Sequence, residues 1–181
     1  MKKLFATIRI IFLNLKRLNL RNLFKLFSTV LSHPLFSILT FWATAKTYAI
    51  SEKLFPITHS TDGAGNAFRH ALWNCLIMMY CCKISSAEKS LHWAKKITDL
   101  HEDLFPNEPL QTKMDLHNNE IGRQYFMSLL PGIHRQFFET SFFVDQLLEL
   151  TKNIIILEKE DQEIGFELVK LEEKRETLVR N

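Results

Sequence analysis

Glycine and proline, the residues that most readily interrupt a helix, occur only five times each in this chain of 181 residues. Hydrophobic residues make up 46% of the sequence, which indicates a compact chain rather than a disordered one. The length suits one domain and is too short for two comfortable ones. We therefore predict a mainly α, single-domain helical bundle over residues 34–150, with an extension at each end.

Start and stop signals for helices are clear in the middle of the chain. A polar, glycine-containing loop over residues 59–66 leads into a helix that runs to about Cys82. Residues 85–88 have the capping-box pattern that opens a second helix. A third helix is expected to begin at or close to Asp115, whose charge suits the positive end of a helix dipole. A fourth helix is expected over residues 135–150.

The last segment, residues 151–181, is strongly charged and less clearly helical. Two short apolar runs, residues 153–157 and 166–171, flank a polar stretch that contains Gly165. Runs of this kind can pair across a turn, so we predict a short β-hairpin. A charged helical tail is the alternative.

The N-terminal segment, residues 1–33, combines basic and apolar residues. Eight Lys and Arg residues and no acidic residue precede Glu52. Apolar residues recur through the segment at helical spacing, which indicates a basic amphipathic helix. This pattern predicts an anionic partner, and a membrane surface is favoured over nucleic acid because Leu, Ile and Phe are interleaved with the bases. An ordinary packing helix with a solvated basic face is the alternative.

Residues 26–45 contain no charged residue, which raises the question of a membrane span. A span needs ~20 strongly apolar residues, whereas His33, Pro34 and several hydroxyl residues dilute this stretch. We therefore expect an interfacial or core helix with Pro34 in its first turn, and a true span is the alternative. The protein is accordingly expected in the cytoplasm or peripheral to a membrane, with secretion left open.

Three clusters of polar residues occupy helical positions that turn them toward apolar neighbours. Asn66, His70 and Asn74 lie four residues apart on the first helix, so they share one face, with Trp73 beside them. A hydrophobic core does not need such an arrangement, and we infer a polar site where three helices meet. The other candidate residues are His101, Glu102, Asp115, Asn118, Asn119 and Arg123.

His70 is the leading catalytic candidate among them. An imidazole with an ordinary pKa of ~6.5 can exchange a proton at neutral pH, and a neighbouring carboxylate can orient the ring. Glu102 and Asp115 are the candidate orienting groups, and His101 adds a second imidazole. The predicted catalytic residues are therefore His70, His101, Glu102 and Asp115.

An anion-binding role is expected for the other polar residues around His70. The guanidinium of Arg123 offers a planar fork, and neighbouring amides add donors for a phosphate, a carboxylate or a developing oxyanion. The alternative is a buried strut in which Arg123 pairs with Glu102 or Asp115. The predicted substrate-binding residues are Asn66, Trp73, Asn118, Asn119 and Arg123.

A metal centre is a further interpretation of the same residues. His70, His101 and Asp115 could supply nitrogen and oxygen ligands to a divalent cation such as zinc. The HExxH pattern is absent, because Phe105 stands where the second histidine would be. Metal binding therefore remains an alternative to metal-free acid–base chemistry.

Three ordered motifs carry a resemblance to a known family: NAFRHALWN at residues 66–74, HE at residues 101–102 and DLHNNEIGR at residues 115–123. They resemble a family of bacterial domains of unknown function that occur alone or at the C-terminal ends of polymorphic-toxin and Rhs-type proteins. The resemblance covers about residues 34–130, and it implies a bacterial, toxin-like hydrolase. His117 falls at a variable position of the third motif. The matching residues are Asn66, His70, Trp73, His101, Glu102, Asp115, Asn118, Asn119, Gly122 and Arg123.

Taken together, the residues predict a hydrolase-like domain that acts on an anionic or lipid substrate at a membrane surface. The alternative is a non-catalytic, membrane-associated binding module whose polar cluster is a structural network. The two differ in geometry, because a catalytic cluster lines an open pocket whereas a structural network is sealed and fully paired.

Overall fold

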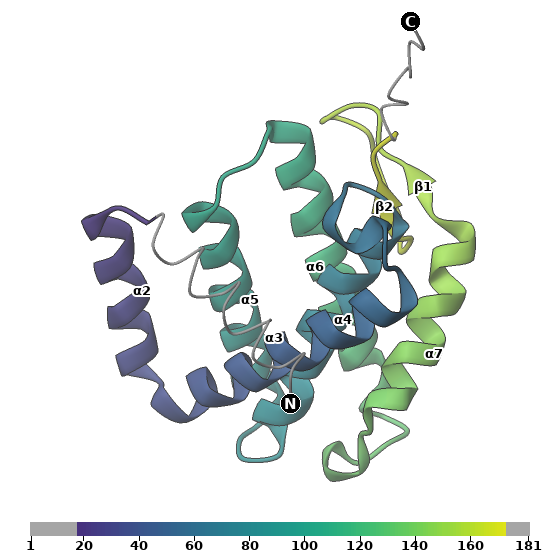
Figure 1. The fold of residues 1–181 in the computed structure, drawn as a ribbon. Coiled ribbons are helices and arrows are strands. Elements are labelled where there is room, and N and C mark those ends of the chain that lie inside the picture. Colours follow the sequence, from purple (N-terminus) through teal and green to yellow (C-terminus); the bar gives the residue numbers. More distant parts are fainter. Residues whose placement is uncertain (1–17, 173–181) are drawn as a thin grey trace, which may run out of the picture.

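The computed structural model describes residues 18–172, which form a mainly α, single domain with one small sheet (Figure 1). The predicted fold class is confirmed. The α-helices are α2 (Leu20–Ser32), α3 (Pro34–Leu54), α4 (Ala64–Cys82), α5 (Ala87–Leu104), α6 (Pro109–Leu129) and α7 (Thr140–Leu150). Three short 3-10 helices, η1 (Thr58–Ser60), η2 (Arg135–Phe137) and η3 (Thr151–Asn153), and the strands β1 (Ile155–Ile156) and β2 (Val169–Lys170) complete the described chain.

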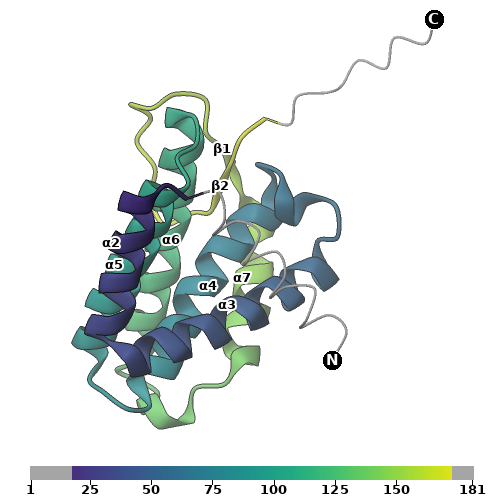
Figure 2. The same ribbon diagram turned by 60° about the vertical axis from the view of Figure 1, so that its left-hand side comes forward.

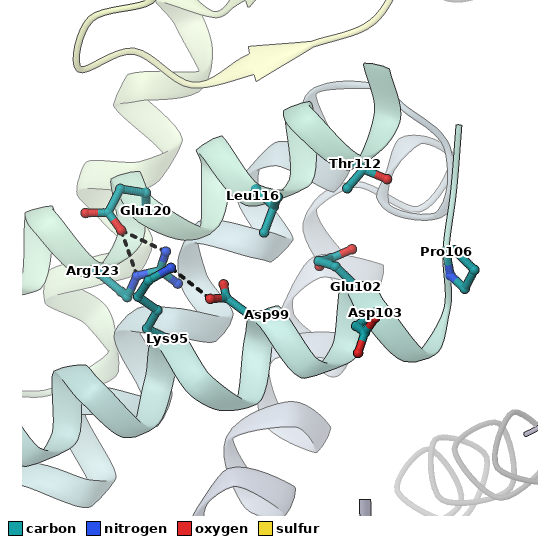
Figure 3. A pocket seen from close by; sticks show the side chains of 9 residues that line it. All are labelled: Lys95, Asp99, Glu102, Asp103, Pro106, Thr112, Leu116, Glu120 and Arg123. Atoms are coloured by element: carbon teal, nitrogen blue, oxygen red, sulfur yellow. Dashed lines mark hydrogen bonds and ion pairs between the residues drawn. The ribbon is translucent and has the colours of Figure 1, made fainter. Parts of the chain in front are cut away.

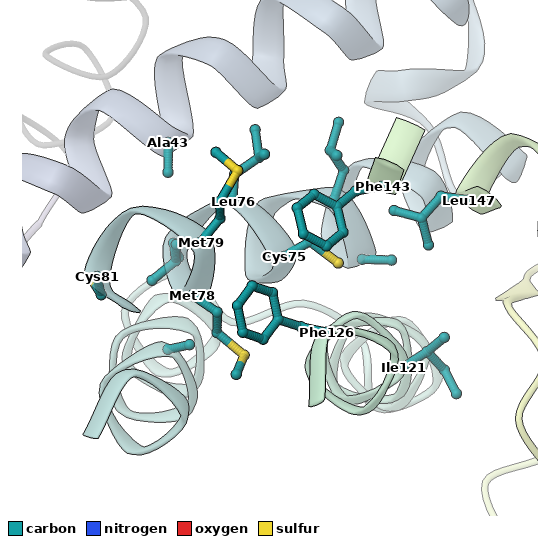
Figure 4. Close-up of a cluster of buried hydrophobic side chains, with 14 of the residues drawn as sticks. Ala43, Cys75, Leu76, Met78, Met79, Cys81, Ile121, Phe126, Phe143 and Leu147 are labelled. Carbon is teal, nitrogen blue, oxygen red and sulfur yellow. The ribbon is translucent and has the colours of Figure 1, made fainter. Parts of the chain in front are cut away.

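Helix α4 is the centre of the fold. Fifteen of its 19 residues are buried, because α3, α5, α6 and α7 all pack against it. Cys75 and Leu76 of α4 meet Phe126 of α6 and Phe143 of α7 in the apolar core (Figure 4). Burial of such side chains is the main favourable term in folding. A polar residue on almost any face of α4 is therefore carried into the interior.

Helices α4 and α6 approach each other closely at Gly122. A Cβ atom at this position would lie 2.2 Å from the backbone oxygen of Ala71. In the same contact the Cys75 thiol donates to the Gly122 carbonyl oxygen at 3.2 Å. Only glycine allows this approach, which brings the polar residues of the two helices within hydrogen-bonding distance.

Most helix ends lie where the local signals predict. Helix α4 follows the predicted loop and ends at Cys82, and the Ser86 side chain caps α5. The predicted helix over residues 135–150 is α-helical only from residue 140. The expected helix start near Asp115 is wrong, because Pro109 occupies the first turn of α6. Asp115 lies in the second turn, where the helix dipole contributes little.

The C-terminal segment contains a strand pair, as expected, but its predicted hairpin geometry is wrong. Strands β1 and β2 are parallel, with Ile155 opposite Val169, so residues 157–168 must carry the chain back past β1. The Asn118 amide of α6 holds β2 in place, since it donates to the Val169 carbonyl at 2.8 Å and accepts from the Val169 N–H at 2.9 Å. The His117 imidazole also donates to a backbone oxygen of this segment, that of Glu167, at 2.8 Å.

Helices α2 and α3 form one outer edge of the molecule, and α2 runs alongside α5 (Figure 2). Pro34 occupies the first turn of α3, as predicted. None of the helices described in residues 18–172 is long and apolar enough to cross a membrane alone, and α2 and α3 meet the criterion only as a pair bent by 112°. Of the predicted basic helix, residues 1–17 lie outside the described part, and α2 contains no buried residue.

Candidate functional site

Three helices bring an imidazole and two carboxylates together in the interior. His70 comes from α4, Glu102 from α5 and Asp115 from α6. The Nε2 atom of His70 lies 3.4 Å from an oxygen of Asp115, and its Nδ1 atom lies 3.8 Å from an oxygen of Glu102. All three side chains are buried. We call these three residues the histidine cluster.

Amide side chains hold both carboxylates of the histidine cluster. Asn66 and Asn107 donate to the two oxygens of Asp115 at 3.4 and 3.3 Å. Asn119 donates from Nδ2 to Glu102 at 3.2 Å. Asn107 was not predicted from the sequence, because it lies in the connection before α6 and has no helical spacing to the other motif residues.

The direction of one hydrogen-bond chain fixes the tautomer of His70. Arg123 can only donate, and its Nη1 atom lies 2.9 Å from Asn74 Oδ1, so the amide oxygen of Asn74 faces the guanidinium. The Nδ2 atom of Asn74 therefore donates to Asn119 Oδ1 at 2.7 Å and to the His70 carbonyl oxygen at 3.0 Å. Because Asn119 Oδ1 is an acceptor, the His70 Nδ1 atom, 3.2 Å away, carries the proton. The unprotonated nitrogen of His70 is then Nε2, on the side of Asp115.

Burial shifts the proton affinities of the whole cluster. It lowers the pKa of His70 well below its ordinary value, and the charge of Arg69 lowers it further. Burial raises the pKa of Glu102 to about 8, and the charge of Asp115 adds to this shift. Burial also raises the pKa of Asp115 to about 7, against the opposing effect of Arg69. Near neutral pH the His70 imidazole is therefore uncharged, the Glu102 carboxyl group is mostly protonated and the Asp115 carboxyl group is partly protonated.

Arg123 lies behind the cluster as a buried strut. Its Nε and Nη2 atoms contact one Glu120 oxygen at 2.9 and 2.8 Å, and its Nη1 atom contacts Asn74 and Thr98 at 2.9 and 3.0 Å. The alternative of a buried strut paired with Glu102 or Asp115 is wrong in its partner, because Arg123 pairs with Glu120, one turn away on the same helix. The amide of Asn118 likewise forms its hydrogen bonds with Val169 of β2. Neither residue therefore has a free donor directed at His70.

A cavity of about 520 Å³ lies between α2, α3, α4 and α5, and His70 is part of its wall. Arg69, which the sequence analysis missed, lines the same cavity. Its Nη2 atom lies 2.5 Å from Asn66 Oδ1 and 3.2 Å from His70 Nε2, to which it donates. Its place beside His70 in the NAFRHALWN run is the signal that could have identified it.

His101 and Trp73 belong to the cavity wall rather than to the histidine cluster. Their rings lie 5.2 Å apart in a T-shaped contact, and the His101 ring lies 5.1 Å from that of Phe105. Burial, with a further effect of Arg69, lowers the pKa of His101 to about 4, so this ring is uncharged at neutral pH. The Trp73 indole donates to the Thr44 hydroxyl at 2.8 Å.

The histidine cluster offers three donor atoms to a metal ion. One atom each from His70, Glu102 and Asp115 lies within 4.8 Å of the other two. This set differs from the predicted one, because His101 turns toward the cavity and Glu102 takes its place. Imidazole and carboxylate suit zinc. However, Arg69 donates to His70 Nε2, so ligation at that nitrogen and this hydrogen bond are alternatives.

A groove of about 690 Å³ between α5 and α6 lies on the other side of the cluster (Figure 3). Glu102 borders this groove, whereas His70 borders the cavity, so their 3.8 Å contact forms part of the wall between the two. The groove is strongly charged. At one end it gathers Lys95, Asp99, Glu120 and Arg123 (Figure 3).

The family described as Domain of unknown function (DUF6973) matches residues 27–155. This span begins within α2, ends in β1 and includes the whole histidine cluster. The chain therefore belongs to this family. Neither the curated proteins nor the solved structures gave a match.

Proposed function

We propose that this member of the DUF6973 family is a hydrolase-like enzyme that acts on an anionic lipid, or a similar amphiphile, at a membrane surface. The observation that carries the proposal is the pairing of His70 and Arg69 in the wall of the cavity, where the guanidinium lies 3.2 Å from the His70 Nε2 atom. A general base, a cation and an apolar cavity thus meet at one point. The toxin-like bacterial context that the motifs resemble is in keeping with such an enzyme.

In the proposed reaction a water molecule attacks the carbonyl carbon or the phosphorus of an ester. His70 Nε2 takes a proton from this water as the new bond to oxygen forms. Arg69 stabilises the negative charge that develops on the ester oxygen. Asp115, which is partly protonated near neutral pH, gives a proton to the departing alkoxide as its bond breaks. Asn119 keeps the proton of His70 on Nδ1, so Nε2 can take the proton of the water once the Arg69 N–H that it accepts has turned to the ester oxygen.

A divalent cation such as zinc is the alternative way to activate this water. Bound to the three donor atoms of the histidine cluster, it would act as a Lewis acid. His70 would then be a ligand rather than a base, and the hydrogen bond from Arg69 to Nε2 would be lost. Activity that persists in the presence of a strong chelator would favour the metal-free reaction.

An exposed apolar face on α2 and α3 supports the membrane part of the proposal. Phe24 on α2 is 73% exposed and Ile38 on α3 is 66% exposed, and no acidic residue occurs between residues 18 and 51. Large apolar patches with basic neighbours are typical of helices that lie in an anionic membrane surface. The exposed large apolar residues of the two helices are Leu20, Leu23, Phe24, Phe27, Leu31, Leu35, Ile38, Phe41 and Trp42.

A non-catalytic, membrane-associated binding module is the second candidate function. The observation that favours it is the half of the polar network in which the buried side chains of Arg123, Asn74 and Thr98 bond to one another. Such a network can fix the register of packed helices without any chemistry. The two candidates make different predictions for purified protein.

The deciding experiment is hydrolysis of vesicle lipids by the wild-type protein and by His70→Gln. Mass spectrometry of the lipids identifies which ester bond is cleaved. Loss of a general base is expected to lower the rate about 10²–10⁴-fold, whereas His117→Gln, far from the cavity on the β2 side, should retain activity. Equal activity of His70→Gln and the wild type would exclude the proposed base. Binding to vesicles without any product would favour the binding module.

A further inference from the structure

The cavity beside His70 has walls of two chemical kinds. The sides formed by α2 and α5 are apolar, whereas α3 presents hydroxyl groups at helical spacing, among them Thr44, Thr47 and Tyr48. The apolar sides consist mainly of Leu26, Val30, Ile97, Leu100, Leu104 and Phe105.

One hydroxyl of the polar side has no partner in the described chain. Thr47 is 2% exposed, and its Oγ1 atom forms no hydrogen bond within residues 18–172. The Thr44 hydroxyl, one turn earlier, accepts from Trp73 and donates to a backbone oxygen. Buried hydroxyl groups are normally hydrogen-bonded. The Thr47 oxygen is also enclosed by protein atoms, so a ligand would reach it only after the side chain turns toward the cavity.

Arg69 brings a positive charge into the same cavity. Its hydrogen bonds go to uncharged atoms, the amide oxygen of Asn66 and the Nε2 atom of His70, and it forms no ion pair within residues 18–172. A guanidinium with little access to water is strongly stabilised by a direct anionic partner. The cavity thus combines an apolar part with a cation that lacks such a partner.

We infer that this cavity binds a single acyl chain with an anionic group, the chain between α2 and α5 and the anionic group at Arg69. A volume of about 520 Å³ is within the ~300–1,000 Å³ typical of ligand sites. The inference rests on the proposed function, for which it names the substrate class. A carboxylate and a phosphate share the required chemistry, so the experiment must separate a fatty acid from a lysophospholipid.

Helix α2 is the wall through which a chain can enter from a bilayer. It contains no buried residue: Leu26 packs only half-buried against the core, and the ion pair between Lys25 and Asp103 of α5 is exposed. Leu26 and Val30 face the cavity, while Phe24 and Phe27 belong to the exposed apolar face. Displacement of this helix at a membrane surface would therefore open the cavity directly toward lipid.

The test is displacement of the fluorescent fatty acid cis-parinarate from the full-length protein. The competitors are hexadecanoate, lysophosphatidylglycerol and, as an uncharged chain, hexadecanol. We expect at least one anionic competitor to displace the probe at about tenfold lower concentration than hexadecanol, and Arg69→Gln to remove most of this preference. The more effective anion identifies the head group.

Leu100→Trp is designed to fill the cavity, and Leu116→Trp is its matched control in the groove between α5 and α6. Leu100→Trp should weaken probe binding about tenfold or more, whereas Leu116→Trp should bind like the wild type, with folding of both checked by thermal unfolding. Wild-type affinity in a folded Leu100→Trp protein, or equal displacement by hexadecanol and both anions, would overturn the inference. Arg69→Leu, if Arg69→Gln fails to fold, tests the same charge.

His70→Gln separates failure of this inference from failure of the proposed function. Probe binding by His70→Gln and the wild type, without lipid hydrolysis by either, would contradict the enzyme and leave the acyl-chain site standing. Lipid hydrolysis that is equally fast in the wild type and in Leu100→Trp would contradict the acyl-chain site and leave the enzyme standing.

Discussion

Replacement of Arg123 by lysine is expected to destabilise the protein strongly, although the charge is kept. The guanidinium reaches Glu120 in one direction and Asn74 with Thr98 in another, which a single ammonium group cannot do. If lysine keeps its bond to Glu120, the buried oxygen of Asn74 loses its best donor, at a cost of about 1–3 kcal/mol. Lost hydrogen bonding to Thr98 adds a further ~1 kcal/mol.

The Glu120 side of this interaction contributes less than the buried side. The Glu120 side chain is 43% exposed, so water can replace part of its bond to Arg123, and its ion pair is worth about 0–1 kcal/mol. The expected loss for Arg123→Lys is therefore about 2–4 kcal/mol. For a domain of this size that corresponds to a fall in Tm of roughly 4–16 °C.

Urea denaturation followed by circular dichroism measures this loss, with Arg21→Lys on the exposed surface of α2 as the control. The control should remain within about 0.5 kcal/mol of the wild type. An Arg123→Lys protein as stable as the control would refute the strut. Nitrogen-15 NMR of the His70 ring provides a second reading, because an Asn74 amide without Arg123 is free to turn. A stability loss with an unchanged Nδ1–H tautomer would show that this chain does not set the proton position.

Three further predictions use other parts of the structure. The pKa of Glu102 is raised from 4.5 to about 8 in the folded protein, so its stabilising contribution is present at low pH and is lost as the pH rises through 8. Between about pH 5 and pH 9, urea titrations should show a larger stability loss for the wild type than for Glu102→Gln, and equal losses would contradict the shift. Gly122→Ala should lower the free energy of unfolding by about 1–3 kcal/mol or more, because the new Cβ atom would lie 2.2 Å from a backbone oxygen. The control is Gly132→Ala, which thermal unfolding should show to be tolerated, because the nearest atom to its Cβ atom is 3.9 Å away. Phe24→Ser should weaken sedimentation with anionic vesicles at low salt, whereas Phe137→Ser, similarly exposed at 71% in η2, should not; equal effects would contradict a specific membrane face.

Helical spacing was sufficient to predict much of the candidate site. Asn66, His70 and Asn74 share a face of α4 because residues four apart always do, and the burial of α4 on all sides carries that face inward. The serines at residues 85 and 86 likewise indicate the start of α5, which the Ser86 side chain caps. These features depend on local geometry and on the apolar content of one segment.

The features that sequence reasoning missed depend on contacts between distant segments. Arg69 matters because α2, α3 and α5 enclose a cavity beside it, and no periodicity within α4 reveals that cavity. Asn118 belongs to the same motif as Asn119, yet its amide faces β2, some fifty residues further along the chain. The parallel direction of β1 and β2 follows from this anchoring to α6 and cannot be read from two apolar runs.

The polar network therefore has two ends with opposite properties. Toward α6 it closes on Arg123, where the donors meet protein acceptors and the arrangement resembles a register device. Toward the cavity it ends on Arg69, a cation without an ion pair in the described chain. A purely structural network gains nothing from an unpaired end, because buried polar groups stabilise a fold only when they are paired. Asn119 joins the two ends, since its Oδ1 atom accepts from Asn74 and also from His70 Nδ1, which leaves His70 Nε2 unprotonated. Arg123 thus fixes the tautomer of His70 through Asn74 and Asn119. At the other end of the network, an anionic ligand would supply the ion-pair partner that Arg69 lacks.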